Sequence, residues 1–155
     1  MTKPLPGPRG LPLLKPPFGS LVAIDMNTGN HHWHIPVGRA SELFPAIQQL
    51  GAAERFGLPA RSFALVTKTV LVVVQMGGRY GSSLQTWRGL PIRDLANLDP
   101  NLWIYDRRTG EMLAEIPVPQ NATGAPATYL AGGKQFIVFL VGGGSLVEEL
   151  IAVSH

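Results

Sequence analysis

Short runs of apolar and polar residues alternate along the chain, and turn-forming residues separate the runs. Residues 20–25 (SLVAID) and 32–37 (HWHIPV) flank one turn, and residues 63–74 (FALVTKTVLVVV) form a long run rich in β-branched side chains. Alternation with a period of two places successive side chains on opposite faces of a strand. The first half of the chain therefore predicts two short paired strands and one long strand.

The second half predicts further strands. Residues 102–106 (LWIYD) and 112–118 (MLAEIPV) flank a second turn, residues 127–142 suggest two strands paired around Gly132-Gly133, and residues 149–155 (ELIAVSH) suggest a last strand. Such regular alternation of strands and turns is typical of an all-β fold.

Three segments depart from this pattern. Residues 1–19 hold six Pro and three Gly, which favours an extended connector, so blades are expected over residues 20–155. In residues 41–57, apolar side chains recur at helical spacing and predict a short helix or helical loop. Residues 79–99 are expected to form a long connection between strands.

The turn pattern D-x-x-T-G occurs twice, at residues 25–29 and 106–110. Asp25 can accept hydrogen bonds from amides two or three residues ahead, and Gly29 can supply the positive φ of a tight turn. Trp33 follows on the outgoing strand, where its ring is expected to pack on a neighbouring sheet. Repeated hairpins of this kind indicate a β-propeller or a β-sandwich. The copies lie about 80 residues apart, which is longer than one blade of about 40 to 50 residues. The extra length is explained by residues 41–57 and 79–99, which both fall between the two copies.

Composition and charge exclude several classes of protein. The chain has 155 residues, with 45% apolar and 15% charged residues, 18 Gly and 14 Pro, which fits a turn-rich globular fold. The net charge of +3 comes from scattered basic residues, so we expect no nucleic-acid partner. There are no cysteines, which excludes disulfides and thiolate metal sites. We find no signal peptide in the first residues, and the apolar run Val70–Val74 is too short to cross a membrane.

Other candidate sites are weak. Among His31, His32 and His34, only the last two share a strand face, and two ligands do not complete a metal site. The run VGGGSL lacks the spacing and the following helix of a phosphate-binding loop, so a turn between strands is expected. No serine has a nucleophile context, and Glu148-Glu149 has no partner carboxylates. The residues themselves predict no catalytic group and no metal ligand.

A wider motif gives a family resemblance. Ala23, Asp25, Gly29 and Trp33 form the pattern A-x-D-x-x-x-G-x-x-x-W, which resembles the tryptophan-docking motif of pyrroloquinoline quinone (PQQ) dependent dehydrogenases. The segments GLPLLKPPFGSLVAID and GAPATYLAGGKQFIVFLVGGG are similar, in the same order, to other family segments. Within the family, the membrane-bound glucose dehydrogenase type is the subgroup that the chain resembles.

The resemblance implies that the chain forms about two to three four-stranded antiparallel blades at the C-terminal end of an eight-bladed propeller. It implies PQQ and Ca²⁺ as cofactors of a complete protein, whose catalytic base and calcium ligands lie in earlier blades. This chain alone is then expected to bind neither cofactor and to be inactive. Its expected partners are the upstream blades, a sugar or polyol substrate and a quinone electron acceptor, at the periplasmic face of the inner membrane.

Two further expectations follow from the resemblance. The loop before the long strand corresponds to one that faces the quinone in the family, so Pro59, Arg61 and Ser62 are candidate cofactor contacts. Ala114 stands where the second turn would carry its docking tryptophan, so Leu113 and Ile116 are expected to pack in its place. The alternative function is a non-catalytic propeller scaffold that binds other proteins through its strand edges.

Overall fold

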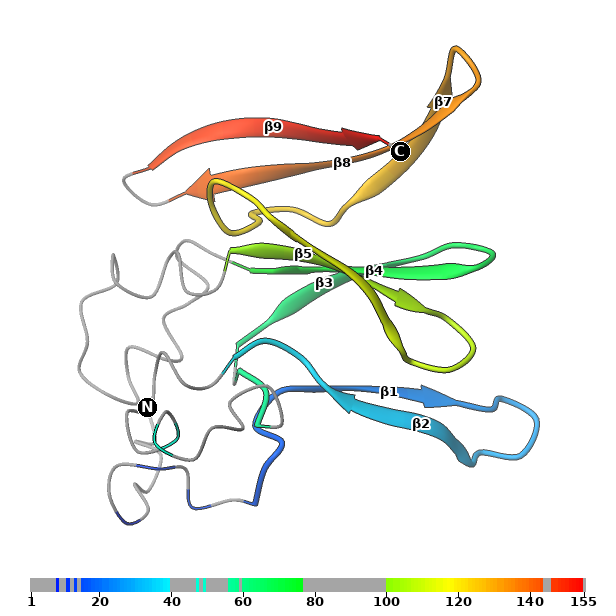
Figure 1. Ribbon diagram of the computed structural model, residues 1–155, viewed down its shortest axis with the longest axis vertical. Helices are drawn as coiled ribbons and strands as arrows, with labels where there is room; N and C mark the ends of the chain where they lie inside the picture. Colours follow the sequence, from blue (N-terminus) through cyan, green and yellow to red (C-terminus); the bar gives the residue numbers. More distant parts are fainter. Residues whose placement is uncertain are drawn as a thin grey trace. The chain divides into compact units, whose positions relative to one another are not determined.

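The computed structural model divides the chain into two compact units, residues 1–60 and 61–155, and each unit is described by itself. The residues that the structure describes are 15–39, 56–58, 60–76, 100–143 and 146–154, with single residues 8, 11, 13, 47 and 49. Across them lie nine β-strands in three antiparallel sheets of two, four and three strands (Figure 1). Most of the predicted helix over 41–57 and the connection over 79–99 lie outside the described residues.

The sheet of the first unit is a hairpin. Strand β1 (Ser20–Ile24) pairs with β2 (His31–Pro36), and the register shifts between Ala23 and Ile24. Ala23 lies opposite Trp33, whereas Ile24 lies opposite His31. His32 is therefore the extra residue of a bulge.

Backbone hydrogen bonds join the two ends of this hairpin to each other and to a later segment of the first unit. The Val37 amide donates to the Gly19 carbonyl at 3.1 Å, and the Leu58 amide donates to the Val37 carbonyl at 2.7 Å. Gly19 and Gly57 pass so closely that a Cβ on either would collide with the backbone of the opposite segment. Only glycine permits such an approach at these positions.

The second unit begins with a four-stranded sheet in the order β3-β4-β5-β6. Its strands are β3 (Ser62–Val66), β4 (Val70–Gln75), β5 (Asn101–Asp106) and β6 (Met112–Pro117). All neighbours are antiparallel and consecutive in the sequence. This meander is the arrangement of a single propeller blade.

The prediction of one long strand over residues 63–74 was wrong, because the chain turns back between β3 and β4. The Thr67 hydroxyl donates to the Val70 carbonyl at 2.9 Å and accepts from the Val70 amide at 3.1 Å. A threonine side chain here performs the role that Gly, Asn or Asp usually has in a turn. The β-branched residues on both sides concealed the turn in the sequence pattern.

The last sheet has the order β7-β8-β9. Strands β7 (Ala127–Ala131) and β8 (Lys134–Gly143) meet at Gly132-Gly133, as predicted, and both glycines have positive φ. Strand β9 (Leu146–Ser154) confirms the predicted last strand but begins three residues earlier. Residues 144 and 145, within the expected VGGGSL turn, lie outside the described residues.

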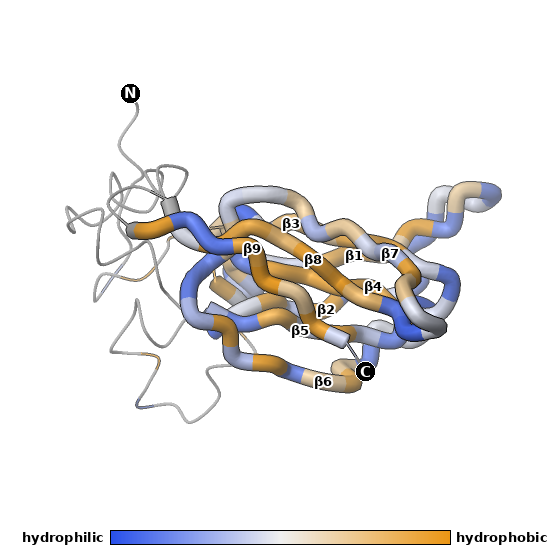
Figure 2. The backbone as a smooth tube through the Cα atoms, turned by 90° about the horizontal axis from the view of Figure 1, so that it is seen from above, coloured by the Kyte–Doolittle hydropathy of each residue, from blue (hydrophilic) through white to orange (hydrophobic). Residues whose placement is uncertain are grey.

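The core of the second unit lies between its two sheets. Its buried members come from β4, β5, β8 and the connection between the sheets: Val72, Val74, Leu102, Val118, Ala122, Phe139 and Val141. Figure 2 shows the corresponding apolar stretches along β4 and β8. The prediction of an all-β, antiparallel fold is confirmed, with one of the three sheets containing four strands.

Candidate functional site

The first D-x-x-T-G turn is held by its aspartate. Asp25 Oδ1 accepts from the amides of Asn27 at 2.8 Å and Thr28 at 3.4 Å, and the Asp25 carbonyl accepts from the Gly29 amide at 2.7 Å. Gly29 has a φ of 74°. The amide hydrogen bond from Asn27 is the main cause that lowers the pKa of Asp25 below its usual value of 3.8. The predicted roles of Asp25 and Gly29 are confirmed.

The second turn repeats this geometry. Asp106 Oδ1 accepts from the amides of Arg108 and Thr109, both at 2.8 Å, and from the Thr109 hydroxyl at 3.1 Å. Gly110 also has a φ of 74°. The hydrogen bond from the Thr109 amide is the main cause that lowers the pKa of Asp106 below 3.8. The two turns are thus the same local structure built twice.

The two hairpins also share their register. Ala23 lies opposite Trp33 in the first, and Ile104 lies opposite Ala114 in the second, with a bulge next to each pair. Trp33 is half-buried, and its packing on an adjacent blade remains a prediction. The position of Ala114 is therefore the structural equivalent of Trp33.

The residues expected to compensate for Ala114 behave differently from each other. Ile116 packs against the core of the second unit, as predicted. Leu113 does not, because 54% of its surface is exposed. Leu113 is the extra residue of the bulge between Met112 and Ala114, whereas Ile116 is paired regularly with Leu102. The prediction for Leu113 was therefore wrong.

The candidate cofactor contacts lie at the start of β3. Arg61 and Ser62 are both exposed, and Pro59 lies outside the described residues. The Arg61 carbonyl accepts from the Met76 amide at 2.9 Å and from Gln75 Nε2 at 3.3 Å. Its backbone is thus fixed, whereas the residue as a whole is exposed, and an arginine guanidinium can donate paired hydrogen bonds to a carboxylate.

Sequence reasoning did not identify Gln75 as part of this site. Gln75 is 2% exposed, and its Oε1 atom has no hydrogen-bond partner. A buried polar oxygen in this state is costly and often marks a place where a water or ligand donates. The signal in the sequence is a single polar residue that ends an otherwise apolar strand, VLVVVQ.

Three of the histidines lie on β2. His31, His32 and His34 are exposed on β2, and among the described residues no group of three or more His, Asp or Glu side chains is placed to hold a metal. No helix in the described part of the chain has the length and apolar character needed to cross a membrane.

Comparison with known proteins agrees with this geometry. The family of PQQ glucose/ethanol/alcohol dehydrogenase β-propeller domains matches residues 1–137. The chain belongs to this family. Its relatives include quinate/shikimate dehydrogenase (quinone) of Acinetobacter baylyi, at 27% identity over 86% of this chain, and quinoprotein glucose dehydrogenase of Escherichia coli, at 25% identity over 90%. The glycerol dehydrogenase large subunit of Gluconobacter oxydans is 25% identical over 86%.

This PQQ propeller chain spans only a small part of those relatives, namely 14%, 15% and 16% of their respective lengths. No solved structure matches the chain. The three relatives are named for different substrates, namely quinate and shikimate, glucose, and glycerol, so the comparisons establish the family and not the substrate.

Proposed function

We propose that the chain contributes blades to a PQQ-dependent dehydrogenase that oxidises a hydroxyl group of a sugar or polyol. The alcohol would become a carbonyl compound, and PQQ would receive the two electrons and two protons. The observation that carries the proposal is the family match over residues 1–137, together with the four-stranded blade β3–β6. The glucose-type subgroup is our preferred assignment, at the periplasmic face of the inner membrane.

Within such a protein, Arg61 is the main proposed PQQ contact, and Pro59 and Ser62 are the other two candidates. Its exposed guanidinium suits a carboxylate of the cofactor, and its carbonyl is fixed by Gln75 and Met76. A fixed backbone reduces the conformational entropy that binding would otherwise cost. PQQ would supply the two-electron chemistry, and Ca²⁺ would be bound by blades other than these.

The other blades are the proposed partners of this chain. Leu140 and Leu150 lie opposite each other on β8 and β9 and are 44% and 67% exposed. In the four-stranded sheet, Leu71 and Trp103 also point away from the core, but both of these side chains are buried. An apolar sheet face needs a second layer, and another blade is the layer that a propeller provides.

The first test is made on the chain alone. Purified residues 1–155 are mixed with Ca²⁺, an artificial electron acceptor and glucose, quinate or glycerol, with and without PQQ, while light scattering reports particle size. We expect no PQQ-dependent reduction, and we expect association through unpaired strand edges. Saturable turnover by a monodisperse monomer would show that this chain carries a complete active site.

The second test uses a longer product that includes the coding sequence around this chain. If the function is right, that product reduces the acceptor in a PQQ-dependent reaction, and Arg61→Ala raises the apparent Kd for PQQ about tenfold, the worth of a hydrogen bond to a charged group. The matched control is Arg108→Ala, at an exposed arginine in the turn at the opposite end of the sheet. A long, folded product that binds no PQQ would favour the scaffold function. Equal effects of both substitutions would exclude Arg61 as a contact.

A further inference from the structure

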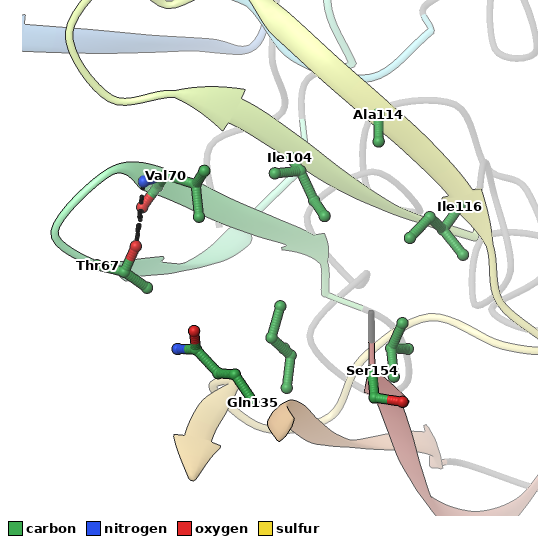
Figure 3. A pocket seen from close by; sticks show the side chains of 9 residues that line it. Thr67, Val70, Ile104, Ala114, Ile116, Gln135 and Ser154 are labelled. Atoms are coloured by element: carbon green, nitrogen blue, oxygen red, sulfur yellow. Dashed lines mark hydrogen bonds between the residues drawn. The ribbon is translucent and has the colours of Figure 1, made fainter. Parts of the chain in front are cut away.

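A cavity of about 260 Å³ lies between the two sheets of the second unit and is partly open to solvent. Figure 3 shows its walls, with β4, β5 and β6 on one side and β8 and β9 on the other. Nine residues line it: Thr67, Val70, Ile104, Ala114, Ile116, Gln135, Ile137, Val153 and Ser154. An engineered apolar cavity of about 150 Å³ binds benzene, so this one has room for a larger ring system.

The position of Ala114 explains why there is space here. The pair Ile104–Ala114 is equivalent in register to the pair Ala23–Trp33. Both pairs adjoin the same turn and the same kind of bulge. The second hairpin therefore presents a methyl group at the place where the first presents an indole. The repeat itself indicates the size and shape of the group that is missing from this wall.

The lining limits the chemistry of an occupant. Most of the wall is aliphatic, from Val70, Ile104, Ile116 and other branched side chains, and no charged side chain contributes to it. A charged ligand would lose its hydration without gaining a partner. An apolar cavity of this kind also holds water poorly, because water needs several polar partners. The wall favours a neutral, flat, largely apolar molecule.

One polar group is oriented by its neighbours. The Thr128 hydroxyl donates to the Phe136 carbonyl at 2.8 Å, so it can only accept from Gln135 Nε2, at 2.9 Å. This fixes the orientation of the Gln135 amide group: its nitrogen donates to Thr128, and its oxygen is left as an acceptor. Figure 3 shows the Gln135 side chain extending from β8 toward the opposite sheet. The amide oxygen can accept from an N–H group within the cavity.

We propose that this cavity binds a neutral bicyclic aromatic molecule with one N–H donor, of the size of indole. The ligand ring replaces the side chain that Ala114 lacks, and its N–H donates to Gln135. Thr67 and Val70 of its lining lie at the end of the β3–β4 pair opposite Arg61.

The test uses 5-fluoroindole and the purified chain, because fluorine signals are free of interference from the three tryptophans. Ligand-observed fluorine relaxation is titrated, and we expect a Kd of about 1 mM or below, as for small ligands in apolar cavities. N-methylindole, which lacks the donor, is expected to compete about tenfold less well than indole. Equal competition by the two would exclude the Gln135 contact.

The decisive variant is Ala114→Trp, which fills the cavity from its own wall. We expect it to abolish binding and to raise the Tm by about 4 °C or more, because the new ring buries apolar surface. The matched control is Ala127→Trp, at an exposed alanine on β7 that does not line the cavity, and it should bind as the unmodified chain does. Ala114→Leu provides a second filling variant should the tryptophan disrupt folding.

Two outcomes would overturn the proposal. The first is no binding of 5-fluoroindole by the unmodified chain. The second is equal binding by the Ala114 variants, which would place the ligand elsewhere or on an aggregate surface. Binding by the unmodified chain and by Ala127→Trp, with loss in both Ala114 variants, would establish the site.

Discussion

The hairpins β1–β2 and β5–β6 have nearly the same backbone and different packing. Each turn has an aspartate that accepts two amides and a glycine with a φ of 74°. Each also has a bulge beside the pair that contains Trp33 or Ala114. The second hairpin closes a four-stranded sheet and borders a cavity, whereas the first forms a two-stranded sheet.

This difference shows that the turn and the docking residue are separable. The hydrogen bonds of the turn all lie within six consecutive residues in each hairpin. They therefore form regardless of which element packs against the outgoing strand. The residue four positions after the glycine determines how much apolar area that strand offers to a neighbour. A repeat can therefore lose its tryptophan without losing its hairpin.

The largest expected effect distinguishes the tryptophans of the two hairpins. Trp103, on β5, is 3% exposed, whereas Trp33 is half-buried. Trp103→Ala should therefore lower the free energy of unfolding by about 3 to 5 kcal/mol, and Trp33→Ala by about 2 kcal/mol, because less apolar area is lost. Denaturation followed by circular dichroism measures both. A loss below about 1 kcal/mol for Trp33→Ala would contradict its role in docking.

A smaller effect is expected at the turn glycines. Gly29→Ala should cost about 1 kcal/mol, because alanine is strained at positive φ even where no atom obstructs its Cβ. Gly110→Ala should cost at least as much, since Gly110 is buried and Gly29 is exposed. The same denaturation experiment applies. If either substitution were neutral, the shared turn geometry would not contribute to stability as described.

The smallest effect concerns pH. The pKa values of Asp25 and Asp106 lie below 3.8 in the folded chain, so their stabilising contribution is present above pH 3.8 and is lost as the pH falls through the folded values. Asp→Asn substitution at either site should flatten the fall in Tm below pH 3.8. The change should be larger at Asp106, whose Oδ1 accepts three hydrogen bonds, not two.

The control for the pH experiment is Glu148→Gln, at an exposed carboxylate on β9 outside both turns. Its Tm profile should follow that of the unmodified chain. An identical flattening by this variant would show that net charge, not the turn geometry, controls acid stability.

Local patterns predicted most of the fold. Both D-x-x-T-G turns, the Gly132-Gly133 hairpin and the alternating strands depend on neighbouring residues, so the sequence reveals them directly. The turn at Thr67 did not stand out, because a β-branched residue forms it with its hydroxyl. The exposure of Leu113 was also missed, since the face of a strand depends on register.

The candidate site was less accessible from the sequence. Arg61 was suggested by resemblance, and its role stays a prediction, whereas Gln75 was missed because its contact with Arg61 joins two separate segments of the chain. The cavity beside Ala114 could not be foreseen either. A cavity depends on how two sheets pack, and that information is spread over residues far apart in the chain.

The bond between Val37 and Leu58 has a consequence for how the chain tolerates changes in length. It holds the two ends of the intervening segment side by side, so the segment leaves and returns at nearly one point. The entropy of closing such a loop grows only logarithmically, by about 0.6 kcal/mol for each doubling of its length. Insertions or deletions between Val37 and Leu58 should therefore cost this chain little stability, provided that Gly19 and Gly57 still let the two backbones pass closely.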